Sequence, residues 1–188
     1  MASKHKYIIR DPKNRNGFIF VDDKIEREKT ENTIREMNQN SNLGFDLLNS
    51  YSEDVRANTP KEWGDGYWID NYMGIDYHGD NIILNFSGYP HDEVSGCFLT
   101  EIEFTSNKYN VFGIKTGDDI SVSRKILKSQ GFEKIKNYAM KWIKNVYKKN
   151  DLYILLITDH DDNKNGNKAK IERIIVEVKT FYLGNRIY

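Results

Sequence analysis

The sequence predicts an α+β fold in which an antiparallel β-sheet packs against one or two helices, with a helical N-terminal arm. Three observations predict it. Apolar and polar residues alternate in stretches between residues 67 and 105 and again between 171 and 180, as in half-buried strands. Residues 120–130 carry apolar side chains at helical spacing between two aspartates and a glycine. Residues 23–40 are rich in Glu, Lys and Arg, which is typical of a mostly solvated helix.

The composition limits the classes of protein to which the chain can belong. It has 188 residues, the size of one domain, and 13% of them are aromatic, which a disordered chain lacks. Lys and Arg number 28, as do Asp and Glu, so the net charge is zero and no nucleic-acid partner is predicted. No apolar run approaches the roughly 20 residues of a membrane-spanning helix, and the single cysteine excludes an intrachain disulfide.

The N-terminus leaves the compartment open. The apolar run Tyr7-Ile8-Ile9 is shorter than the core of a secretory signal, which needs about 7–15 residues. We therefore expect a cytoplasmic protein if the chain is complete and an exported one if a signal peptide has been removed.

We expect a single globular unit in two parts, with residues 1–52 as a polar lead-in and helical N-terminal arm, and 53–188 as an α+β domain. In the first part, 17–21 is predicted as a strand and 23–40 as a helix whose apolar residues are Ile25, Ile34 and Met37. A short helix is predicted over 43–51, followed by a loop over 52–66 that contains Pro60.

The predicted sheet has about five to seven strands. Strands are expected over 67–77, 81–86 and 97–105, as a meander with one solvated face, and over 110–113. In the third of these, alternation places Ile102 and Phe104 on one face and Glu101 and Glu103 on the other. Residues 152–158 and 171–180 are predicted to pair as an antiparallel hairpin around a polar loop.

The predicted helix over 120–130 has recognisable ends. Asp118 or Asp119 is expected to cap its first turn through a carboxylate, and Gly131 to end it in a left-handed conformation with Phe132 folding back. From 133 to 149 a helical stripe predicts helix in the first half and allows a strand in the second. The lysines of 134–149 are read as a solvated helix face rather than as a nucleic-acid patch.

The motifs YNVFGIKTGDDI from residue 109, Ile126-Leu127 and Gly131-Phe132 resemble a module of small exported Gram-positive proteins. The module runs strand, GIKxGD, helix, LxxxGF and β-hairpin, and is similar to β-lactamase-inhibitor-like and YjgB-like domains. The resemblance covers roughly residues 109–180. It implies a small antiparallel sheet on one or two helices, and binding or inhibition rather than catalysis. The family shares no catalytic residues, so the resemblance assigns none here.

One motif points to a metal. Residues 161–172 satisfy the calcium-loop pattern D-x-[DN]-x-[DN]-G-x5-E, in which oxygen ligands alternate around a glycine turn and end in a bidentate glutamate. The predicted ligands are Asp161, Asn163, Asn165, Asn167 and Glu172. The alternative is a solvated hairpin loop in which Asp, Asn and Gly serve turn geometry, because both flanks read as strands. In that case there is no cofactor.

A crowded aromatic stretch is the predicted partner-binding surface. Its residues are Trp63, Tyr67, Trp68 and Tyr72. Tyr and Trp dominate protein interfaces, although alternating aromatic residues also fill the core of a thin sheet. Glu101 and Glu103 could form a carboxylate pair, but alternation alone explains their position on a wet face.

The sequence contains no H-x-x-x-H spacing for a metal enzyme and no G-x-S-x-G nucleophile turn. The buried-strand context of Cys97 favours a small hydrophobic role over a nucleophile. We therefore predict a non-enzymatic binding or inhibitory protein, immunity- or inhibitor-like, that acts through a protein partner. The alternatives are an exported calcium-binding module that uses the 161–172 loop, and an uncharacterised enzyme.

Overall fold

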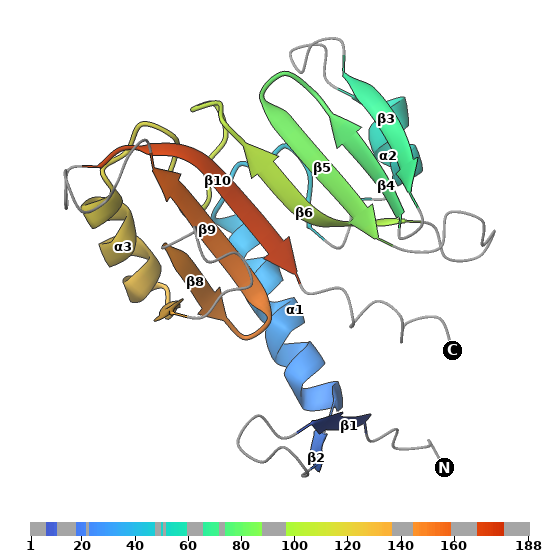
Figure 1. Cartoon of the computed structure of the whole chain (residues 1–188), viewed down its shortest axis with the longest axis vertical. Coiled ribbons are helices and arrows are strands. Elements are labelled where there is room, and N and C mark those ends of the chain that lie inside the picture. Colours follow the sequence, from blue (N-terminus) through green and yellow to red (C-terminus); the bar gives the residue numbers. More distant parts are fainter. Residues whose placement is uncertain are drawn as a thin grey trace.

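The structure is a computed structural model, and it describes residues 7–10, 18–21, 23–47, 50, 52–59, 66–71, 74–87, 97–136, 145–158 and 169–178. Its main feature is an eight-stranded sheet in which every neighbouring pair is antiparallel, in the order β3-β4-β5-β6-β10-β9-β8-β7 (Figure 1). The strands are β3 (Tyr67–Asn71), β4 (Gly74–His78), β5 (Ile82–Ser87), β6 (Phe98–Phe104), β7 (Glu133–Ile135), β8 (Val146–Lys149), β9 (Leu152–Thr158) and β10 (Ile171–Val178).

A separate two-stranded sheet pairs β1 (Tyr7–Arg10) with β2 (Phe18–Val21). The helices are α1 (Asp23–Gln39), α2 (Ser52–Ala57) and α3 (Ile120–Ser129). The chain therefore combines an antiparallel sheet with helices, as predicted, but the described sheet has eight strands rather than five to seven. No helix in the described part is long and apolar enough to cross a membrane.

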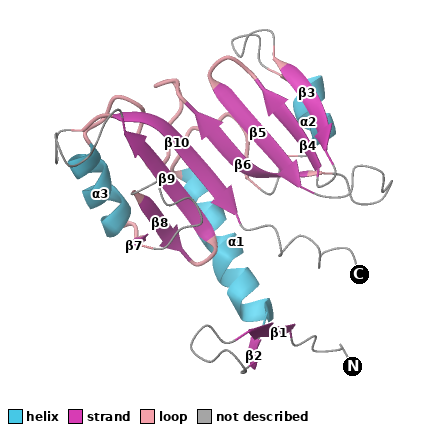
Figure 2. Cartoon of the chain, in the orientation of Figure 1, coloured by secondary structure: helices cyan, strands magenta, loops and turns pink. Residues whose placement is uncertain are grey.

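The two faces of the large sheet differ. On the inner face, Leu84, Ile102, Ile154 and Val176 are buried in one continuous core with residues of all three helices. Figure 2 shows α1 passing behind β9 and β10, and α2 behind β3 and β4. The opposite face, here called the outer face, takes the alternate residues of each strand. It holds a smaller buried group made of Val146, Tyr153, Leu155 and Ile175.

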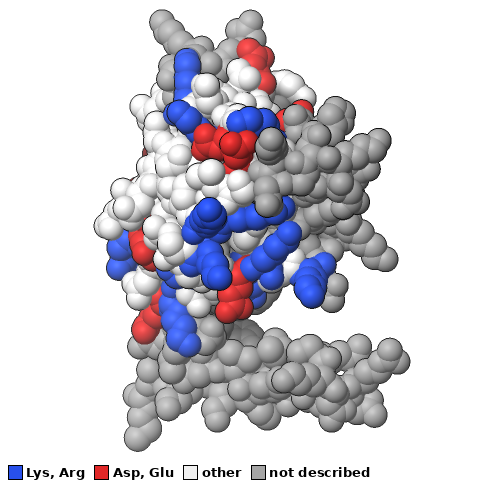
Figure 3. Space-filling model, turned by 90° about the vertical axis from the view of Figure 1, so that its left-hand side faces the viewer, with Lys and Arg blue, Asp and Glu red and all other residues white. Residues whose placement is uncertain are grey.

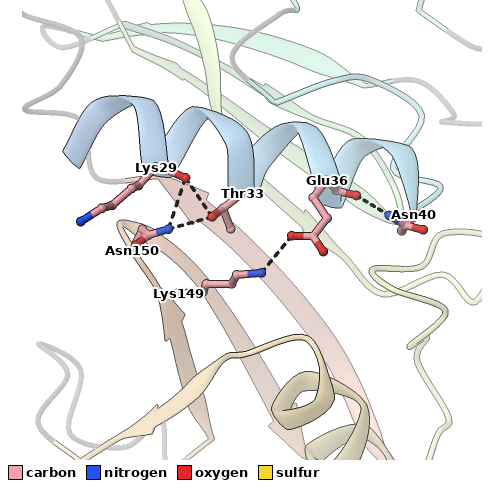
Figure 4. Close-up of polar contacts among 6 residues, drawn as sticks. All are labelled: Lys29, Thr33, Glu36, Asn40, Lys149 and Asn150. Atoms are coloured by element: carbon pink, nitrogen blue, oxygen red, sulfur yellow. Dashed lines mark hydrogen bonds and ion pairs between the residues drawn. The ribbon is translucent and has the colours of Figure 1, made fainter. Parts of the chain in front are cut away.

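Helix α1 is fastened to the turn between β8 and β9 (Figure 4). Ile34 and Met37 are buried in the core. The Asn150 amide donates hydrogen bonds to the Lys29 carbonyl oxygen (3.2 Å) and to the Thr33 hydroxyl (2.8 Å). Asn150 has a φ of 53°, a conformation that asparagine tolerates better than most residues. The core thus includes part of the segment predicted as an arm.

Two predictions between residues 43 and 66 are wrong. Residues 43–47 form no helix, although Leu43 and Leu47 are buried as their spacing suggested. Their neighbours bond elsewhere: Asn42 pairs with Asn110, and the Asn38 side chain bonds to both the N–H and the carbonyl oxygen of Leu47. The helix follows instead at α2, where a loop was predicted. Its acidic first turn and basic last turn suit the helix dipole.

Helix α3 and its end confirm the prediction. Gly131 has a φ of 80°, the Phe132 N–H donates to the Leu127 carbonyl oxygen, and the Gly131 N–H donates to the Lys128 carbonyl oxygen. These are the two bonds of a Schellman terminator. The start is different. Asp119 occupies the capping position, but its carboxylate makes no capping bond and instead pairs with Lys170 at 3.0 Å.

The helix predicted for the first half of 133–149 is wrong over the described residues. Glu133–Ile135 is strand β7, and it pairs with β8, so Ile135 lies opposite Val146 and Lys134 opposite Tyr147. The middle of the helical stripe falls on 137–144, outside the described residues, and the strand allowed for the second half is confirmed by β8 (Val146–Lys149). Pairing at the edge of the sheet outweighs the local helical period here, because strand propensity depends on tertiary context.

The hairpin predicted from 152–158 and 171–180 is confirmed by the pairing of β9 with β10 over 171–178. The predicted strand 67–77 is two strands, β3 and β4. Residues 110–113 form isolated bridges rather than a strand, because Val111 pairs back onto Ile114 across a turn.

Candidate functional site on the outer face of the sheet

Edge strand β3 divides the aromatic stretch between the two faces of the sheet. Tyr67 and Ile69 point to the outer face, where they are 59% and 40% exposed. Trp68, between them, points to the inner face and packs against Tyr77 and Phe86, with ring centroids 5.1 and 5.8 Å apart. Tyr67 is therefore exposed on the surface, whereas Trp68 packs against the core.

The Tyr67 ring is held in place by its neighbour. Tyr67 lies opposite His78 in the register, and the two rings stack with centroids 5.2 Å apart and planes 8° from parallel. Trp63 and Tyr72, which the sequence groups with Tyr67, lie outside the described residues. The site therefore consists of one ordered aromatic ring with Ile69 beside it on the same edge.

A charged group lies behind this edge, on the inner side of β3. The Arg56 guanidinium of α2 lies 4.7 Å from the centre of the Trp68 ring and 3.5 Å from the Asp70 carboxylate. The Asp70 side chain is 77% exposed. Edge strands commonly carry such charges.

One row of directly opposed residues crosses all eight strands on the outer face. In sheet order it is Ile69, Asp76, Asn85, Glu101, Glu177, Tyr153, Lys148 and Glu133. Its centre holds two carboxyl groups on adjacent strands, at the junction of β6 with β10. The Asn85 amide donates a 2.6 Å hydrogen bond to Glu101 Oε1.

The environment of Glu101 favours its protonated form. Burial, followed by the negative charge of Glu177, raises the pKa of Glu101 to about 7, against the lowering effect of the Asn85 hydrogen bond. The sequence suggested Glu103 as the partner, but Glu103 forms an ion pair with Arg173 at 3.0 Å. The residue that lies beside Glu101 is Glu177. In the sequence, Glu177 alternates with Val176 and Val178, which indicates the face on which it lies but not the residue opposite it.

The other end of the sheet is basic. Figure 3 looks onto the end that carries α3, β7 and β8, where Lys and Arg side chains gather across the middle of the face. Of the predicted solvated lysines, Lys134, Lys148 and Lys149 lie on strands β7 and β8 rather than on a helix. Arg124 Nη2 and Lys134 Nζ both donate to Asn145 Oδ1, at 2.8 and 3.2 Å. The same end of the sheet has an open pocket of about 400 Å³, whose charged lining residues are Lys148 and Lys149 together with Glu133 and Asp151.

The calcium-loop residues Asp161, Asn163, Asn165 and Asn167 lie outside the described residues, and Glu172 is exposed on β10. In the described ranges, no group of three or more His, Cys, Asp or Glu side chains could hold a metal ion. Cys97 is buried, as its strand context predicted, and burial raises the pKa of its thiol.

The outer face thus offers an ordered aromatic edge at β3 and a carboxyl pair at its centre, whereas Lys134, Lys149 and Arg124 lie on the inner side at the other end of the sheet. Comparison with protein-family models, with curated proteins and with solved structures found no match to this chain.

Proposed function

We propose that this chain is a non-enzymatic binding or inhibitory protein whose protein partner docks on the outer face at Tyr67 and Ile69. One observation carries the proposal. Of the three exposed large hydrophobic side chains in the described residues, these two stand side by side on one face of one strand, and the third, Val122, lies on α3.

Binding at Tyr67 should cost little conformational entropy. A tyrosine ring provides a large contact area with few rotatable bonds, so little conformational entropy is lost when a partner covers it. Stacking on His78 already restricts the Tyr67 ring before binding. Rigid aromatic anchors of this kind dominate binding energies. The resemblance of 109–180 to β-lactamase-inhibitor-like proteins supports the same class of function.

The test is a capture experiment followed by a measured affinity. Tagged parent protein captures its partner from the cells that produce the parent protein, and the partner is then identified and purified. The dissociation constant of the complex is measured for the parent and for Tyr67→Ser. A hot-spot loss of at least about 2 kcal/mol predicts binding weakened roughly 30-fold. The partner's own activity should fall as the parent protein binds it.

The matched control is Val122→Ser, which also removes an exposed apolar side chain, 51% exposed, but from α3. This variant should bind the partner as tightly as the parent does. Equal affinity of the parent and Tyr67→Ser for every purified partner would contradict the proposal, as would equal losses in the two variants.

A further inference from the structure

The sheet ends at β3, whose far edge has no neighbouring strand among the described residues. The N–H and C=O groups along such an edge can accept another strand. We propose that β3 pairs with β3 of a second copy of this chain, antiparallel and centred on Ile69, so that two sheets join into a symmetric dimer. This proposal goes beyond the protein-binding function proposed above and does not depend on it.

The register follows from the two-fold symmetry. An antiparallel pairing centred on Ile69 places Ile69 opposite Ile69 of the second copy, Tyr67 opposite its Asn71, and Trp68 opposite its Asp70. The Ile69 side chain, which is 40% exposed in the single chain, would then pack against Ile69 of the second copy across the axis. Directly opposed apolar pairs of this kind stabilise antiparallel strands.

Charge complementarity favours a second copy over an unrelated strand. Asp70 would lie beside the other copy's Trp68, whose ring carries Arg56 at 4.7 Å. Each Arg56 would therefore form an ion pair with its own Asp70, at 3.5 Å, and a second one with the Asp70 of the other copy. Symmetry produces this arrangement twice, and no two like charges of β3 are opposed, because Asp70 is the only charged residue in the strand.

The two proposals share Ile69 but rest on different groups, the charges of Arg56 and Asp70 for the dimer and the Tyr67 ring for the partner. Arg56, Trp68 and Asp70 lie on the inner side, whereas Tyr67 lies on the outer face. The axis of such a dimer is perpendicular to the sheet, so both outer faces point the same way. Tyr67→Ser should therefore weaken the dimer less than either charge variant of Arg56 or Asp70, and the charge variants keep the Tyr67 ring, so failure of one proposal can be told from failure of the other.

The experiment measures the mass of the purified chain by sedimentation equilibrium, with no partner present. The parent should be dimeric. Arg56→Asp and Asp70→Arg should each weaken the dimer at least tenfold, because each places like charges opposite one another across the axis. Val122→Lys, which adds a charge on α3, should sediment with the same dimeric mass as the parent.

Mixing the two charge variants in equal amounts gives the decisive result. Within each variant the Arg56–Asp70 pair stays broken, but across the axis opposite charges meet again, so the mixture should form a heterodimer. Circular dichroism checks that each variant is folded. A monomeric parent overturns the proposal. A mixture that stays monomeric while both variants are folded overturns it as well, and so does a parent dimer that neither variant weakens.

Discussion

The stability of this protein should fall as the pH rises from 5 to 8, because of Glu101. The pKa of this carboxyl is about 7 in the folded chain, compared with a reference value of 4.5 that we take for the unfolded chain. The folded state therefore keeps a proton that the unfolded state releases above pH 4.5. The resulting stabilisation is fully present below pH 4.5 and is lost as the pH rises through 7.

The size of the effect follows from the two pKa values. Their difference, at 1.36 kcal/mol for each factor of ten in the acid constant, corresponds to about 3 kcal/mol. Roughly three quarters of this falls between pH 5 and pH 8, because the unfolded carboxyl is already mostly ionised at pH 5. Glu101→Gln places a neutral amide where the protonated carboxyl stood, facing Asn85 and Glu177. The variant should therefore lack this pH dependence and exceed the parent in stability at pH 8.

Urea unfolding at a series of pH values, followed by tryptophan fluorescence, measures the free energy of unfolding of both proteins. Subtracting the variant from the parent cancels the other titrating groups. The matched control is Glu103→Gln, two residues along the same face, which removes the ion pair with Arg173 and should retain most of the parent's slope, because the charge of Glu103 contributes less to the raised pKa of Glu101 than burial and Glu177 do. A difference between parent and Glu101→Gln that stays constant or grows in the parent's favour as the pH rises would refute this reasoning.

Three further predictions test the turns and the loop. Gly131→Ala should cost about 1 kcal/mol and lower Tm by about 2–4 °C, from backbone strain alone, because a Cβ there would meet only the Lys149 side chain at 3.7 Å; an unchanged Tm would contradict this. Asn150→Gly keeps the turn but removes both bonds to α1, so it should cost about 1–3 kcal/mol in urea unfolding, and Asn150→Ala about 1 kcal/mol more. Calorimetry in millimolar calcium tests whether the 161–172 loop binds the metal. If it does, calcium at ~100 times Kd adds ~2.7 kcal/mol to the free energy of unfolding, and Glu172→Gln loses most of this gain. If the loop is only a turn, calcium leaves the Tm of both proteins unchanged.

The elements that sequence reasoning predicted correctly are those with strong local determinants. Gly131 and Phe132 end α3 as predicted, because a left-handed terminator needs only a glycine and an apolar residue after it. Strands β6, β9 and β10 alternate or are wholly apolar in the sequence, and burial follows that pattern.

The errors occurred where contacts distant in sequence decide the structure. Leu43 and Leu47 have helical spacing, yet the backbone around them bonds to Asn110 and to the Asn38 side chain. Strand β7 forms because β8 lies beside it. The same limit applies to the site, because alternation indicates the face on which Glu101 lies, but only the register places Glu177 beside it.

The position of β10 has a consequence for biosynthesis. This strand is the last described in the sequence but lies in the middle of the sheet, between β6 and β9. During synthesis, the edge of β6 that pairs with β10 stays open until residues 171–178 have left the ribosome. Phe104 and Ile174, which then pair, are 70 positions apart, and closing such a loop is slow compared with forming a local hairpin. A nascent or truncated chain therefore exposes an apolar strand edge, and folding is the stage at which this protein is most open to aggregation and to chaperones.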